Sequence, residues 1–175
     1  MSYFRDLIPD IYLLGYVRVA AAVPKVAVGD VEINVMEHIE LAESASQQGV
    51  DIVTFPELSL TGYTCKDEFL NTQLIRDAYS GLAVFCFRTR NLRSIFIVGL
   101  PLVDLSGRLL NVAAVVYQGE VLAFIPKSYV PNYGEFEETR WFLPALGLKF
   151  ENISFNNRSV PLGTDIIISH PEINC

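Results

Sequence analysis

Glu57 and Lys127 each stand directly after an apolar run and a proline. The sequence is "VTFPE" at the first position and "FIPK" at the second, and a loop with aromatic residues follows each. In open α/β sheets ligands gather at the carboxyl ends of strands, so these two side chains could meet in one pocket. There an ammonium group would stabilise an anion while a carboxylate takes up a proton. The same residues are also compatible with a turn cap at Glu57 and a structural salt bridge between the two.

The first part of the chain, which leads to Glu57, predicts a β-α-β unit. Residues 15–24 are rich in β-branched and small apolar side chains, which predicts a buried first strand. Asp30 predicts the N-cap of a helix with one apolar face, and Gly49 predicts its end. The run "VDIVTF" follows at once as a second strand. A crossover of this kind favours parallel strands.

The rest of the chain predicts a second helix and further strands. Apolar residues recur at three- and four-residue spacing through much of 67–91, which indicates a helix. Strands are predicted at 94–104, 109–117, 121–126, 149–155 and 164–169, with short turns that favour hairpins among the first three. We therefore expect an α/β fold with a mixed sheet, and the 175 residues are expected to form a single domain or part of one.

Composition limits the classes of partner, location and site that are expected. The formal net charge is -7 and the basic residues form no dense block, which argues against a nucleic-acid partner. No leader-like or membrane-spanning run occurs, so the expected location is the cytoplasm, away from a membrane. Glycine-rich phosphate loops are absent. Only two histidines, His38 and His170, are present, and three widely spaced cysteines match neither a disulfide framework nor paired metal ligands, so no metal site is expected.

Two longer segments, "FPELSLTGY" and "PKSYVPNYGEFEETRWF", contain Glu57 and Lys127. Both resemble signature segments of the nitrilase (carbon-nitrogen hydrolase) superfamily, in particular the amino-terminal glutaminase domain of glutamine-dependent NAD synthetases. The resemblance covers almost the whole chain. It implies a nitrilase-like αββα sandwich in which Glu57 is the general base and Lys127 the catalytic lysine. It also implies that Tyr133 contacts the bound glutamine, and that Glu135 supports the lysine and positions the substrate.

The activity that the resemblance implies is release of ammonia from L-glutamine by a Cys-Glu-Lys thioester mechanism. The glutaminase domain would use no cofactor. The ammonia would supply a synthetase domain that makes NAD from deamido-NAD with ATP and Mg²⁺, and nothing in this sequence resembles the "S-G-G-x-D-S" loop of such a domain. The resemblance also implies association into a homo-oligomer.

The nucleophilic cysteine is the part of the set that this sequence does not match. The family cysteine lies in a strand similar to "G-x-E-I-C-E-D", whereas the chain ends in "SHPEINC", with a proline and one extra residue before Cys175. One extra residue would turn the thiol to the opposite face of a strand. We expect the nucleophile strand to begin after Cys175, so that residues 1–175 form a partial glutaminase domain. Cys86 is expected in the core, and Cys65 lies in a loop without a strand-end setting.

Two other hypotheses stay open from the sequence. Glu57 and Lys127 are shared across the superfamily, so the parent protein could be another nitrilase-type amidase or nitrilase. Alternatively, the chain could be a catalytically dead short form that acts as an interaction module.

Overall fold

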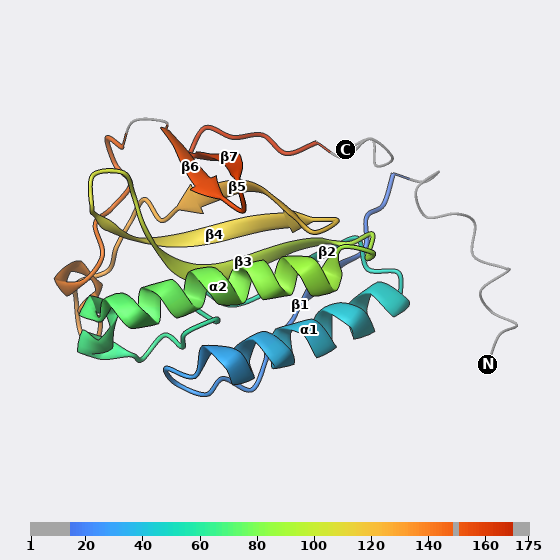
Figure 1. Ribbon diagram of the computed structural model, residues 1–175, viewed down its shortest axis with the longest axis horizontal. Helices are drawn as coiled ribbons and strands as arrows, with labels where there is room; N and C mark the ends of the chain where they lie inside the picture. Colours follow the sequence, from blue (N-terminus) through green and yellow to red (C-terminus); the bar gives the residue numbers. More distant parts are fainter. Residues whose placement is uncertain (1–14, 149–150, 170–175) are drawn as a thin grey trace, which may run out of the picture.

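The computed structural model describes residues 15–148 and 151–169. Its centre is a seven-stranded sheet with the strand order β1-β2-β3-β4-β5-β7-β6. Figure 1 shows helices α1 and α2 side by side over one face of this sheet. The mixed α/β architecture predicted from the sequence is confirmed. Within the described residues it consists of one helical layer and one mixed sheet, and no helix there is long and apolar enough to cross a membrane.

The β-α-β unit forms as predicted, with one difference. Helix α1 (Val31–Gln47) begins where the Asp30 carboxylate accepts a hydrogen bond from the backbone N–H of Ile33, and it joins two parallel strands. These are β1 (Val19–Ala21) and β2 (Ile52–Thr54). The prediction that the first strand is buried was wrong. Among the described strands β1 lies at the edge of the sheet and pairs with β2 alone, and its three residues are short of full burial and mostly exposed.

The second helical region is divided in two. A 3₁₀ segment, η3 (Lys66–Leu70), ends at Asn71, and α2 (Thr72–Thr89) begins there. The Asn71 side chain accepts from the backbone N–H of Gln73, so a local N-cap interrupts what the apolar spacing predicts as one helix.

Three long strands follow: β3 (Ile95–Val103), β4 (Leu109–Tyr117) and β5 (Glu120–Pro126). β3 is parallel to β2, and the β3-β4 and β4-β5 pairs are antiparallel hairpins, as the sequence predicts. Phe96 on β3 packs edge-on against Phe85 on α2, with ring centroids 5.5 Å apart, so the Phe96 face of the sheet carries the helices.

The last described part of the chain differs from the prediction. The expected short strand is present as β6 (Glu151–Phe155), and it pairs with β7 (Arg158–Leu162), a strand that was not predicted from the sequence. The turn between them holds two asparagines at positive φ, a pattern typical of tight hairpins, so "NN" was an available signal. Residues 164–169 form no strand, and Ile167 is 96% exposed. A β-branched run forms a strand only where another strand accepts its hydrogen bonds, and among the described strands none pairs with it.

Candidate functional site

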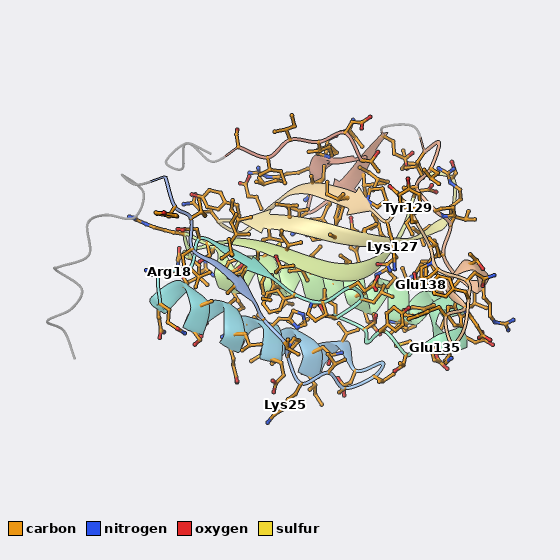
Figure 2. The ribbon with its side chains drawn as sticks, turned by 180° about the vertical axis from the view of Figure 1, so that it is seen from behind. Arg18, Lys25, Lys127, Tyr129, Glu135 and Glu138 are labelled. Carbon is orange, nitrogen blue, oxygen red and sulfur yellow. The ribbon has the colours of Figure 1, made fainter. Side chains whose placement is uncertain are left out.

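The carboxyl ends of β1, β2, β3 and β5 lie at the same end of the sheet. β1, β2 and β3 are mutually parallel. β5 runs in the same direction as β3, because the β3-β4 and β4-β5 hairpins each reverse the direction of the chain. Glu57 follows β2 and Lys127 follows β5, so topology alone brings both to this end. Figure 2 shows Lys127 there with Glu138 and Glu135, far from Arg18 at the start of β1.

At this end a single ammonium group joins two carboxylates. Lys127 Nζ donates to Glu57 Oε2 at 2.7 Å and to the two carboxylate oxygens of Glu138 at 3.0 and 2.9 Å. The amide Nδ2 of Asn111 donates to the same Glu57 oxygen at 2.9 Å. The structure therefore places Glu57 and Lys127 in direct contact, and their catalytic roles stay a prediction. The Glu57 side chain is 46% exposed and that of Glu138 is 3% exposed, so Glu57 is the acid that a small molecule can reach.

Glu57 reaches Asn111 and Lys127 because β3 carries a glycine beneath it. Strands β3 and β4 separate β2 from β5, so the Glu57 turn must cross β3. A Cβ added at Gly99 would lie only 2.4 Å from Pro56 O, 2.5 Å from Leu58 N and 2.6 Å from Glu57 Cα. The backbone of the turn thus rests directly on the backbone of β3, a close approach that only glycine permits. Leu58, the residue after Glu57, has a φ of 53°, which is rare outside glycine and indicates a turn held by its surroundings.

The loop after β5 supplies the second carboxylate. It folds back through η4 (Glu138–Arg140), and Lys127 O accepts from Ala145 N at 2.9 Å, so the two ends of the loop are tied together. The Glu138 carboxylate also accepts a short hydrogen bond from the Tyr63 hydroxyl. Burial, followed by this hydrogen bond, raises the pKa of Tyr63. Tyr63 is therefore a neutral donor at neutral pH.

The ammonium form of Lys127 is favoured by its two partners. Burial by itself lowers the pKa of Lys127, but hydrogen bonds to Glu57 and Glu138 outweigh burial, and the net shift is upward. At neutral pH the group is a fixed positive charge next to an accessible carboxylate. Such a pair can stabilise a developing oxyanion and move a proton.

The two predicted substrate residues lie near this cluster but outside its hydrogen bonds. Tyr133 is 72% exposed and borders an open hollow of about 510 Å³ that also contains Lys127 and Tyr129. Glu135 borders a separate cavity of about 200 Å³ together with Tyr63 and Glu138. The acid in contact with the lysine is Glu138, three residues beyond the predicted Glu135.

Glu138, Asn111 and Tyr63 were not predicted from the sequence as members of the site. The run "GEFEE" offers three acids, and only the 3₁₀ turn of η4 decides which of them faces the lysine. Asn111 is a polar residue in an otherwise apolar strand, which was a usable signal in the sequence of a buried polar contact, and the structure shows it only 3% exposed.

Neither described cysteine belongs to this cluster. Cys65 is buried and its thiol donates to Thr61 O at 3.1 Å, while burial raises its pKa. Cys86 lies in the core on α2, as predicted, and burial raises its pKa to about 12. Thiols with raised pKa values are poor nucleophiles. Cys175 and His170 lie outside the described residues.

Comparison with known proteins gives a consistent family. The carbon-nitrogen hydrolase family model matches residues 18–164. The glutamine-dependent NAD(+) synthetase of Mycobacterium tuberculosis is 32% identical over 162 residues, which are 93% of this chain and 24% of that relative. The glutamine-dependent NAD(+) synthetase of Thermotoga maritima is 37% identical over 139 residues, which are 78% of this chain and 24% of that relative. The chain thus spans about a quarter of the length of the curated relatives that it matches.

Solved structures agree. A glutamine-dependent NAD(+) synthetase from Cytophaga hutchinsonii superposes with a TM-score of 0.80 at 27% identity, over 88% of this chain and 26% of that one. An amidase from Nesterenkonia superposes with a TM-score of 0.62 at 24% identity over 84% of this chain and 54% of that one, which supports the fold alone. With the acid-lysine cluster at the sheet end and a family match over most of its length, this chain belongs to the carbon-nitrogen hydrolase family.

Proposed function

We propose that this chain is part of a glutamine amidohydrolase domain that supplies ammonia to an NAD synthetase. The observation that carries the proposal is the contact of the Lys127 ammonium with an accessible Glu57 and a buried Glu138. Relatives that cover most of the chain at 30% identity or more are named glutamine-dependent NAD(+) synthetases, which supports glutamine as the substrate.

In the proposed reaction a cysteine thiolate attacks the side-chain amide carbon of glutamine, and a carbon-sulfur bond forms. Glu57 takes the thiol proton and passes it to the leaving ammonia as the carbon-nitrogen bond breaks. Lys127 stabilises the tetrahedral oxyanion. Water then hydrolyses the thioester, with Glu57 again as the base. The thiol is not contributed by the described residues.

The remaining roles follow from position. Tyr133 would contact glutamine where it borders the hollow that contains Lys127, and Glu135 would position substrate from the neighbouring cavity. We assign the support of the lysine to Glu138 in place of Glu135, because the Glu138 carboxylate accepts hydrogen bonds from Lys127 Nζ. ATP and Mg²⁺ would be used by a synthetase domain of the parent protein, in the cytoplasm, and not by this domain.

The test is ammonia release from L-glutamine by the full-length gene product that contains this chain. Glu57→Gln should lower kcat at least about a hundredfold, the contribution typical of a general base. Glu120→Gln is the matched control, because Glu120 has a similar exposed fraction of 44% and pairs with Arg158 away from the site. Full activity of Glu57→Gln would refute the assignment of the base.

Substrate choice is tested in the same preparation. The proposal expects NAD to form from deamido-NAD, ATP and L-glutamine. Hydrolysis of small amides without this NAD synthesis would instead identify another nitrilase-type amidase.

A further inference from the structure

Helix α1 carries two buried polar residues next to the turn that bears Glu57. The side chains of Asn34 and His38 lie one helical turn apart, and both residues are fully buried. Ser59, two residues after Glu57, is 1% exposed. Three buried polar groups at one place need hydrogen-bond partners, and each of them finds one here.

The contacts run from the helix to the turn. His38 Nε2 lies 2.7 Å from Ser59 Oγ, and His38 Nδ1 lies 2.6 Å from Asn34 O. Because a carbonyl only accepts, Nδ1 is the protonated nitrogen and Nε2 accepts from the serine hydroxyl. Asn34 Nδ2 donates to Leu60 O at 3.1 Å, and the same amide exchanges two hydrogen bonds with the backbone of Ala27.

These bonds hold the Glu57 turn from one side while β3 supports it from the other. Leu60 N donates to Gly99 O at 3.2 Å, so the segment from Glu57 to Leu60 lies between α1 and β3. The positive φ at Leu58 lies inside this segment. A backbone conformation of that kind persists only where the surrounding structure fixes it.

We propose that His38 and Asn34 are positioning residues that set the place of Glu57 through Ser59 and Leu60. This inference rests on the proposed function for its effect on catalysis, but the placement of Glu57 against Lys127 can be measured without any substrate. His38 touches neither Glu57 nor Lys127. Its effect is therefore on the geometry of the base, and not on the chemistry itself.

The first test is Ser59→Ala, which removes the hydroxyl with little change in volume. Ser94→Ala is the matched control, since Ser94 is also 1% exposed and its hydroxyl donates a single hydrogen bond, to Val50 O at 2.6 Å. Ser94 precedes β3, at the end of the sheet opposite to Glu57. In the full-length gene product Ser59→Ala should lower kcat tenfold to about a hundredfold with KM changed less than about twofold, since misplacing a catalytic group acts on the chemical step. Ser94→Ala should change neither.

A second variant separates positioning from stability. His38→Phe combined with Ser59→Ala makes both partners apolar and places a phenyl ring beside Phe55, whose ring centroid is 4.4 Å from that of His38. Replacing both partners of a buried hydrogen bond restores much of the lost stability. The double variant should therefore recover the midpoint of urea unfolding but not kcat.

The substrate-free measurement is NMR titration of the Lys127 ammonium in the same full-length gene product. The pKa of Lys127 should fall in Ser59→Ala and in the double variant, because the contact with Glu57 loosens, and it should stay unchanged in Ser94→Ala. A pKa that stays at the wild-type value in both Ser59 variants overturns the positioning role. If the titration shifts but no variant or wild type releases ammonia, the proposed function fails and the positioning role stands.

Discussion

Substitution of Gly99 by alanine would place a methyl group against the backbone of the Glu57 turn. Ordinary contacts of a Cβ begin near 3.4 Å, and the nearest atom, Pro56 O, would be 2.4 Å away, a shortfall of 3.4 − 2.4 = 1.0 Å. The other two close atoms, Leu58 N and Glu57 Cα, also belong to the backbone, so no side-chain rotation relieves the overlap. The turn must therefore move by about 1 Å.

The energetic cost follows from overpacking. Inserting one methyl group into a packed site costs about 1–3 kcal/mol, and we expect about 3 kcal/mol here because the obstructing atoms are backbone. A shift of this size would also stretch the 2.7 Å contact between Lys127 Nζ and Glu57 Oε2 beyond hydrogen-bond range. The pKa of Lys127 should then fall, because one of its two carboxylate partners is lost.

Urea unfolding gives the stability change, and NMR titration of the lysine ammonium groups gives the pKa of Lys127, both in the full-length gene product. Gly81→Ala is the control. Its Cβ would lie 2.6 Å from Val31 Cγ1 and 2.9 Å from Val35 Cγ2, a similar overlap made with side chains between α1 and α2. It should alter stability and leave the Lys127 titration unchanged. A Gly99→Ala variant with wild-type stability and a wild-type Lys127 pKa would show that the Glu57 turn does not rest on the backbone of β3.

Three further predictions concern the titration of Tyr63, His38 and Asp67. Glu138→Gln should destabilise the fold by about 1–3 kcal/mol in urea unfolding. It should also lower the raised pKa of Tyr63 in an absorbance titration, because the buried carboxylate beside the phenol is gone; an unchanged tyrosine titration would contradict it. Burial lowers the pKa of His38 to about 4, below its ordinary 6.5, so the unfolded chain binds this proton first as the pH falls. Stability present above about pH 6.5 should decline by up to about 3 kcal/mol towards pH 4, and a His38→Phe chain with the same pH slope would exclude His38 as the cause. A hydrogen bond from Arg140 and, as the second cause, one from Trp141 lower the pKa of Asp67 to about 2. The contact of these two side chains with the Asp67 carboxylate should therefore persist above about pH 4 and be lost as the pH falls through 2. Trp141 is the sole tryptophan in residues 1–175, so its fluorescence should separate Asp67→Asn from wild type at pH 7, and the difference should fall to about half near pH 2.

Much of the fold followed from local patterns. The strand directions were predictable because the β-α-β crossover and the two short hairpin turns leave few alternatives. The predictions were wrong where strand propensity alone does not decide the structure. β1 lies exposed at a sheet edge, and residues 164–169 have no partner strand among the described residues. Hydrogen bonds between strands are tertiary contacts, so a β-branched run does not determine them by itself.

That one acid and one lysine reach the same end of the sheet was predictable from the sequence alone. Glu57 and Lys127 each follow a strand, and the order of elements aligns those strands. Which second acid contacts the lysine, and how the Glu57 turn is held, depends on contacts between elements that are distant in the sequence. Glu138 and not Glu135 accepts from the lysine because η4 turns it inward, and His38 holds Ser59 from a helix 21 residues earlier in the chain. The physical reason is that hydrogen bonds depend on distances of about 3 Å between side chains, and sequence spacing does not set distances between separate elements.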